Sequence, residues 1–164
     1  MKNIVTMIAA MAAFGFSLAA HAAEWKQIGK GTYSVMFIDA YDITLTSPNG
    51  NYDPNAPHAL AIKYRMDFSA EDINDRSIDE MERDNGLSNS ERNRFASELA
   101  KVMPNVKEGD VIRAQFTPGE KTDFFKNGKP IGTVKDAAFT EKFSAIWLAE
   151  NTNAPGLRND LLAK

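Results

Sequence analysis

The side chains that most often carry out catalysis or bind metal ions are scarce in this chain of 164 residues. Cysteine is absent, and the two histidines are His21 and His58. A Cys/His zinc set and a catalytic thiol are therefore excluded, and a Ser-His-Asp triad would have to use His58. His58 follows Asn55-Ala56-Pro57 just ahead of an expected strand, which is ordinarily an exposed loop end. We predict no catalytic residue, no cofactor and no tightly bound transition metal, with weak calcium binding by carboxylates left open.

The first 22 residues have the pattern of a cleavable secretory signal peptide. Lys2 supplies a positive charge, Ile4 to Leu18 form an apolar run, and Ala20-His21-Ala22 supplies the small-x-small cleavage pattern. The run is shorter than the about 20 apolar residues that span a bilayer, so an uncleaved anchor is the less favoured alternative. We expect a mature domain of residues 23–164 in the periplasm, with no membrane span after cleavage.

The expected mature chain has the size of one domain and a mildly acidic charge. Removing 22 of 164 residues leaves 142, which is enough for one sizeable core. Because Lys2 leaves with the signal peptide and no acid does, 19 basic residues become 18 against 22 acidic ones, a formal charge of −4. That balance gives no electrostatic reason to expect nucleic acid or an anionic membrane as a partner.

The first half of the mature chain has the residue types of β-strands. Segments rich in aromatic and β-branched residues are separated by Gly29, Gly31 and Asp39, which predicts strands at Trp25–Ile28, Tyr33–Phe37 and Tyr41–Leu45. A long loop from Thr46 to His58 follows. The next segment, Ala59–Phe68, is expected to be a half-buried strand because its apolar residues alternate, at Leu60, Ile62, Tyr64, Met66 and Phe68.

Two amphipathic helices are predicted after these strands. Ser69 has the features of a helix N-cap with acids in the first turn, and Asn85-Gly86 ends the segment. Ser88 and Glu91 fit a capping box that begins a second helix, which Pro104 ends. The apolar stripes of both helices are expected to face the core.

The rest of the chain returns to strands and then to helices. Val111–Phe116 and Asp123–Lys126 are expected strands, and Asn127-Gly128 is a strong hairpin signal that leads into Ile131–Val134. A third helix begins at Asp136 or Thr140, and a short one covers Gly156–Leu162. This order predicts an α+β fold, a mainly antiparallel sheet with helices packed on one face.

Several segments together resemble the chalcone isomerase-like proteins, and specifically their exported bacterial branch. The matching segments are Phe37–Leu45, Ala59–Ile73, Val106–Asp110, Phe125–Gly132, Phe139, Phe143, Ile146-Trp147-Leu148, Pro155 and Leu157-Arg158. The resemblance spans nearly the whole mature chain. It implies an open sheet with helices on one side and a cleft for an elongated or planar small molecule.

The resemblance also bears on activity, because the family includes plant enzymes that close chalcones into flavanones and relatives that bind fatty acids. The enzymes use an arginine near the first strands, with a threonine, a tyrosine and an asparagine that arrange water and the developing oxyanion. Here the threonine position falls on Ile38 and the tyrosine position on Phe68, and no arginine precedes Arg65. The polar constellation of the enzymes is not recognisable in this chain.

Arg65 is the residue that the resemblance favours for an acidic ligand. Fatty-acid-binding relatives place a carboxylate-binding arginine on a strand ahead of the same helix, and a guanidinium can hold a carboxylate through two parallel hydrogen bonds. Arg65 also shares its strand face with Lys63 and Asp67, and such an alternating polar face is more often solvated. Tyr41 and Tyr64 are the next candidates for ligand binding.

Three functions are open at this point. The favoured hypothesis is a non-catalytic periplasmic binder of a small hydrophobic or carboxylate ligand. An isomerase of the chalcone isomerase type, an intramolecular lyase, is the first alternative. The second alternative is an accessory domain whose surface binds a protein partner that the sequence does not identify.

Overall fold

Six antiparallel strands form one sheet in which the spatial order of the strands equals their order in the sequence. The structure is a computed structural model that describes residues 24–164, so the expected signal peptide lies outside the described residues. The strands are β1 Lys26–Val35, β2 Ile38–Ser47, β3 His58–Tyr64, β4 Val111–Thr117, β5 Lys121–Lys126 and β6 Lys129–Val134. The helices are α1 Ala70–Asn85, α2 Asn89–Val102, α3 Ala137–Leu148 and α4 Pro155–Leu162.

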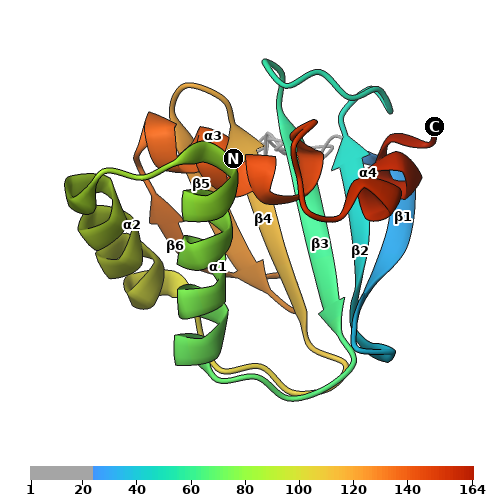
Figure 1. Cartoon of the computed structure of the whole chain (residues 1–164). Coiled ribbons are helices and arrows are strands. Elements are labelled where there is room, and N and C mark those ends of the chain that lie inside the picture. The colour runs from blue at the N-terminus through green and yellow to red at the C-terminus, as the bar shows by residue number, and fades with distance from the viewer. Residues whose placement is uncertain (1–23) are drawn as a thin grey trace, which may run out of the picture.

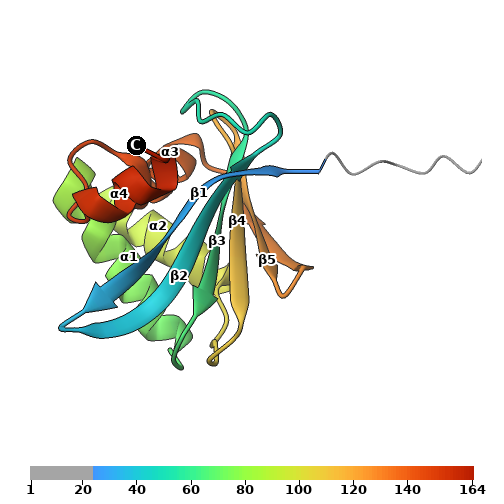
Figure 2. The same cartoon turned by 90° about the vertical axis from the view of Figure 1, so that its right-hand side faces the viewer.

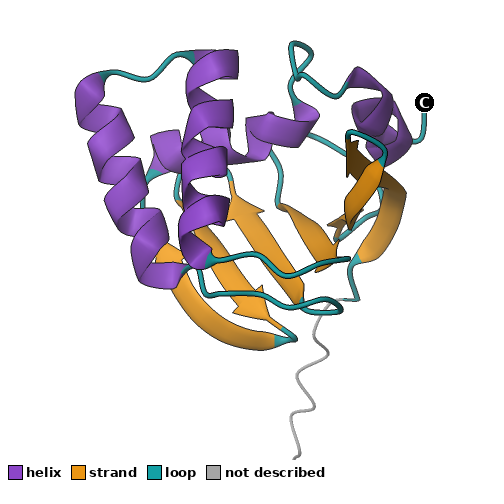
Figure 3. Cartoon of the chain, turned by 60° about the horizontal axis from the view of Figure 1, so that its bottom comes forward, coloured by secondary structure: helices purple, strands orange, loops and turns teal. Residues whose placement is uncertain are grey.

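All four helices lie on the same face of the sheet, as Figures 2 and 3 show. Figure 1 shows α2 beside β6 and α4 beside β1, with α1 between them. The predicted α+β fold with helices on one face is therefore confirmed. The core lies between the two layers, and its fully buried large side chains include Phe95, Phe116, Phe124 and Phe139. No helix within residues 24–164 is long and apolar enough to cross a membrane.

The helix caps and the second hairpin form where the sequence predicts them. The Ser69 side chain accepts a hydrogen bond from the Asp72 backbone at the start of α1, and Ser88 and Glu91 form a complete capping box on α2. Asp136, rather than Thr140, caps α3. The β5–β6 hairpin turns at Asn127 and Gly128, whose φ values of 50° and 81° are those that a two-residue turn requires.

The first strand departs from the prediction, because Lys26–Val35 is one strand and not two. We expected Gly29 and Gly31 to separate strands, but they lie inside β1 where α4 crosses it. A Cβ atom on Gly29 would lie 2.2 Å from the backbone oxygen of Asp160 and 2.4 Å from that of Leu161. Glycine at position 29 therefore serves the close approach of strand and helix and does not end the strand.

The third strand ends earlier than predicted. β3 stops at Tyr64, and Phe68 instead forms an isolated bridge with Val106. Leu60 and Ile62 are buried as expected, whereas Met66 is 41% exposed because it follows the end of the strand. The chain between Tyr64 and Phe68 thus leaves the sheet and crosses toward the start of α1.

Candidate functional site

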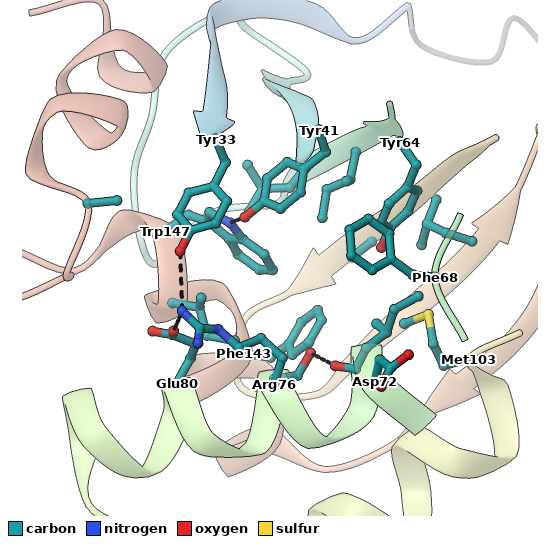
Figure 4. A pocket seen from close by; sticks show the side chains of 18 of the residues that line it. Tyr33, Tyr41, Tyr64, Phe68, Asp72, Arg76, Glu80, Met103, Phe143 and Trp147 are labelled. Carbon is teal, nitrogen blue, oxygen red and sulfur yellow. Dashed lines mark hydrogen bonds and ion pairs between the residues drawn. The ribbon is translucent and has the colours of Figure 1, made fainter. Parts of the chain in front are cut away.

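An apolar cavity of about 490 Å³ lies between the helical face of the sheet and helices α1 and α3. Its walls come from β1, β2 and β3 on one side and from α1 and α3 on the other, as Figure 4 shows. The volume lies within the roughly 300–1,000 Å³ that small-molecule sites occupy. We call this cavity the tyrosine pocket, after Tyr33, Tyr41 and Tyr64 in its wall.

The three tyrosines form a row across three neighbouring strands. The sheet register pairs Tyr33 with Tyr41 and Tyr41 with Tyr64, so all three side chains leave the same face of the sheet. The rings of Tyr33 and Tyr41 stack with centroids 5.1 Å apart, and Tyr41 and Tyr64 meet edge to face at 6.2 Å. Phe68 continues the row, with its ring centroid 5.6 Å from that of Tyr64.

The hydroxyl groups of the row differ in their partners. Tyr33 Oη accepts a hydrogen bond from Arg76 Nη2 at 3.2 Å, and Tyr41 Oη accepts one from Trp147 Nε1 at 2.9 Å. Tyr64 is buried, and its hydroxyl forms no hydrogen bond with another residue of the described range, 24–164. Figure 4 shows the Tyr64 side chain within the pocket, so its hydroxyl is a donor available to a bound molecule.

Burial sets the protonation state of the two inner phenols. Desolvation raises the pKa of Tyr41 well above its usual range, although the hydrogen bond from Trp147 opposes the shift. Desolvation raises the pKa of the Tyr64 hydroxyl in the same direction. Both phenols are therefore neutral at physiological pH, which makes them hydrogen-bond donors and not bases.

The opposite wall carries charge on α1. Arg76 and Glu80, four residues apart, form an ion pair with 2.6 Å between Nη2 and Oε1. The Glu80 side chain is 8% exposed and that of Arg76 60%, so the carboxylate lies deep and the guanidinium lies at the mouth. Glu80 is also bound by Arg83 and accepts a hydrogen bond from Asn153 Nδ2 at 3.3 Å. Asp67 and Asp72 are further acids in the wall.

The structure brings together two of the three predicted ligand residues. Tyr41 and Tyr64 line the pocket, whereas Arg65 lies outside it. Arg65 is exposed and bonded to two acids, with Nη2 2.9 Å from Asp42 Oδ1 and Nη1 3.1 Å from Asp39 Oδ2. The hydrogen bonds from Arg65 hold the pKa of the Asp42 carboxyl below its usual range. Successive strand residues face opposite sides, so Arg65 is directed away from the pocket that Tyr64 enters.

Sequence reasoning missed Arg76 and Glu80 as residues of the pocket. We expected the apolar stripe of the first helix to face the core, and Ile73 and Ser77 on that helix do line the cavity. Arg76 and Glu80 follow Ile73 at intervals of three and seven residues, which places them on the same helical face. That spacing was the signal by which the sequence could have identified Arg76 and Glu80, because a charged pair on the core-facing side of a helix indicates a binding site.

The expectation of an exposed His58 was wrong. His58 is 3% exposed, because β3 begins at this residue and α3 covers it. Its Nε2 lies 2.7 Å from Ser144 Oγ and its Nδ1 lies 2.9 Å from the carbonyl oxygen of Ala56. Nδ1–H therefore donates to Ala56, and Nε2 accepts from Ser144. His58 does not line the tyrosine pocket and joins β3 to α3.

The two positions that lack the enzymes' hydroxyl groups lie in different surroundings. Phe68 lines the tyrosine pocket, where its ring contributes apolar surface. Ile38 is exposed at the start of β2 and is not part of the wall. Among residues 24–164, no three side chains of histidine, cysteine, aspartate or glutamate are grouped to hold a metal ion.

Comparisons with known proteins agree with the fold. The sequence model of the family described as chalcone isomerase-like matches residues 12–163 of this chain. An uncharacterized protein of Haemophilus influenzae is 28% identical over 150 residues, which cover 91% of this chain and 73% of that protein. A fatty-acid binding protein of Arabidopsis thaliana has a similar structure, with a TM-score of 0.64 and 14% identity, covering 84% of this chain and 86% of that one.

Proposed function

The chain belongs to the chalcone isomerase-like family, and from this premise we propose that it binds a small, largely apolar molecule in the tyrosine pocket without converting it. The observation that carries the proposal is the Tyr64 hydroxyl, which lies in the wall of an apolar cavity and forms no hydrogen bond with another described residue. The hydroxyl is not among the fully enclosed side-chain atoms that lack a partner, so it is open to the cavity and can donate to a bound molecule. A ligand with one acceptor and an apolar body supplies that partner.

The ligand class that we propose is an elongated molecule with a carboxylate head. The similarly folded protein of Arabidopsis thaliana is a fatty-acid binding protein, which supports this class. The apolar body would lie against the rings of Tyr33, Tyr41, Tyr64 and Phe68. The head would lie within reach of the Tyr64 hydroxyl or of Arg76 at the mouth.

Arg76 can take part without leaving a buried charge unpaired. It is bonded to Glu80, but Glu80 has a second cation in Arg83 and a further donor in Asn153. Arg76 can therefore turn toward a ligand carboxylate while Glu80 keeps its other partners, which avoids the penalty of an isolated buried acid. A guanidinium is well suited to the task because it can donate two parallel hydrogen bonds to a carboxylate.

Binding without catalysis is favoured by the protonation states in the pocket. The ionisable groups in its described wall are tyrosines, acids and Arg76, with no histidine, lysine or cysteine. The pKa values of Tyr41 and Tyr64 are raised by burial, so neither phenol is a base. Glu80, the buried carboxylate of the wall, is held in ion pairs by Arg76 and Arg83. The three phenols are the observation that supports the alternative, an isomerase, because neutral phenols can donate hydrogen bonds to a developing oxyanion.

We place this binding in the periplasm, and the proposal rests on the pattern of residues 1–22. The protein isolated from a periplasmic fraction should begin at Ala23. Intact-mass analysis of that fraction measures the start directly. A protein that retains Met1, or one recovered only from the cytoplasm, would contradict the proposed location. It would not contradict the proposal that the tyrosine pocket binds a ligand.

The binding proposal is tested by titrating the delipidated chain from Ala23 with dodecanoate and with dodecanol, using calorimetry. Tyr64→Phe removes one hydroxyl and should weaken dodecanoate binding by about 2- to 10-fold, the value of one hydrogen bond. Tyr52→Phe is the matched control, since Tyr52 packs against His58 outside the tyrosine pocket. A folded protein that binds neither dodecanoate nor dodecanol would exclude the proposed function.

A further inference from the structure

The turn between β1 and β2 exposes four consecutive large apolar side chains. Val35 is 47% exposed, Met36 86%, Ile38 61%, and Phe37 is fully exposed. We call these residues, Val35 to Ile38, the hairpin tip. Figure 2 shows the β1–β2 hairpin projecting away from the other strands. Contiguous exposed apolar surface of this kind marks an interaction site.

The backbone of the hairpin tip is strained. Met36 and Phe37 have φ values of 48° and 69°, in the left-handed region that disfavours large side chains. The β5–β6 hairpin of the same chain has the same kind of two-residue turn, but there the two residues are Asn127 and Gly128, which this turn prefers. No packing explains Met36 and Phe37, because both are exposed. Strain that the fold does not require points to a function of these two side chains.

The hairpin tip lies beside the tyrosine pocket. Tyr33 and Tyr41 face each other across β1 and β2 in the pocket wall. After a register shift between Tyr33 and Ser34, the pairing resumes with Ser34 and Asp39 and ends with Val35 and Ile38. At about 3.3 Å per strand residue, the first residues of the tip lie roughly 7 Å beyond the tyrosine pair. Met66, which lines the pocket and is itself exposed, lies at the same end of the sheet.

We propose that the hairpin tip inserts into the apolar region of a lipid bilayer and holds the mouth of the tyrosine pocket against it. An apolar ligand then passes between the bilayer and the pocket without crossing water. The passage of ligand rests on the proposed function, whereas the docking of the tip does not.

The shape and charge of the tip favour a bilayer over a protein partner. Four side chains on a convex turn offer much less than the roughly 800 Å² per partner that a stable protein interface buries. A fluid apolar medium adapts to such a protrusion, and bulky apolar residues are those that anchor peripheral proteins. The nearby cation Arg65 is paired with Asp39 and Asp42, so the tip has no excess positive charge. Insertion should therefore occur on neutral lipid and persist at high salt.

The test uses the chain from Ala23, which contains every described strand and helix and omits the apolar run of residues 4–18. Binding to phosphatidylcholine vesicles is measured by flotation, and ligand affinity by dodecanoate titration without vesicles. The tip variant Met36→Asn/Phe37→Gly installs the residues of the other hairpin, so it should fold with a raised melting temperature. We expect vesicle binding by this variant to fall by about tenfold or more, with dodecanoate affinity unchanged.

The pocket variant Tyr64→Phe is the matched control and should float like the wild type while its dodecanoate affinity falls. Equal flotation of the wild type and the tip variant, or no flotation of the folded wild type, would overturn the proposal. Self-association that requires the tip, detected by sedimentation, would assign the surface to a second copy and would overturn it as well. Flotation of a protein that binds neither dodecanoate nor dodecanol would support the docking of the tip and would contradict only the proposed function.

Discussion

At the scale of single residues, the site depends on which side of the sheet a side chain enters. Tyr64 and Arg65 are neighbours in sequence, yet Tyr64 lines the pocket and Arg65 pairs with Asp39 and Asp42 outside it. The resemblance favoured Arg65 for an acidic ligand, but Arg76 is the arginine that lines the pocket. The ligand role of each arginine stays a prediction. Replacing Arg76 should weaken ligand binding, whereas replacing Arg65 should not.

Arg76→Ala should weaken dodecanoate binding by about 3- to 10-fold, less than a buried charged contact because Arg76 is largely exposed. Arg65→Ala should leave the affinity unchanged, since its partners are two surface acids. Calorimetric titration of both variants, each shown to be folded by circular dichroism, measures the difference. The opposite ranking would return the carboxylate site to Arg65, and dodecanol, which lacks the carboxylate, should not distinguish Arg76→Ala from the wild type.

His58 should make stability depend on pH. Burial lowers the pKa of the His58 imidazole below its ordinary value of 6.5, and the hydrogen bond to Ala56 only partly opposes this. Its neutral form is therefore favoured in the folded state, so its full contribution is present above pH 6.5 and is lost as the pH falls toward the folded pKa. Urea unfolding of the wild type should show lower stability at about pH 5.5 than at about pH 7.5.

His58→Gln is the control for this pH dependence, because glutamine does not titrate. The variant should be less stable at the higher pH, since it loses the bonds to Ser144 and Ala56. When the pH is lowered from the higher to the lower value, the free energy of unfolding of the variant should fall by less than that of the wild type. An equal loss in both proteins would mean that other groups cause the pH dependence.

At the scale of elements, the contact of β1 with α4 shapes the strand beside the pocket. The backbone carbonyl groups of Asp160 and Leu161 reach Gly29 so closely that no side chain fits there. The other end of the same strand carries Tyr33 and the hairpin tip. β1 thus packs against α4 at its start, lines the tyrosine pocket near its end and is exposed to solvent at the hairpin tip.

Gly29→Ala should lower the free energy of unfolding by about 1–3 kcal/mol, because the new Cβ atom meets backbone that has to shift. Gly156→Ala in α4 is the matched control, since nothing lies within 4 Å of its added Cβ atom. That variant should be unchanged or up to about 1 kcal/mol more stable, because alanine is the better helix former. Urea titration of both measures the difference, and a fully stable Gly29→Ala protein would mean that α4 does not lie as close as described.

At the scale of the whole molecule, the fold positions an apolar pocket near the strained hairpin tip at one end of the sheet. The sheet of a chalcone isomerase-like protein is retained, and three tyrosines line the pocket. Ile38, which the resemblance places at the position of the enzymes' threonine, belongs to the exposed tip. Together, our two proposals assign binding and delivery of a ligand to this scaffold.

Chalcone cyclisation by this protein should proceed at or near the uncatalysed rate. Ile38 and Phe68 have no hydroxyl to donate, and the loss of one such donor lowers the rate of an enzyme by about a hundredfold or more. The measurement is the absorbance of a chalcone with and without the protein. Turnover that Tyr41→Phe or Tyr64→Phe abolishes would instead identify an isomerase that uses the phenols of the pocket.

The sequence alone determined the types of most elements, because the signals for them are local. Alternating apolar residues predicted β3, Ser69 and the Ser88–Glu91 capping box predicted the starts of α1 and α2, and Asn127-Gly128 predicted a hairpin. Each of these patterns depends on the geometry of a few neighbouring residues. The order of the elements then predicted the α+β fold.

Only the tertiary structure decided what surrounds each residue. The row of Tyr33, Tyr41 and Tyr64 depends on the register of three strands. The burial of His58 depends on α3, whose Ser144 is 86 residues away in the chain. The need for glycine at position 29 depends on the close approach of the α4 backbone. These contacts join segments far apart in sequence, so no local pattern records them. Residue types and spacing specify how a segment folds, whereas the packing of distant segments specifies which side chains share a cavity.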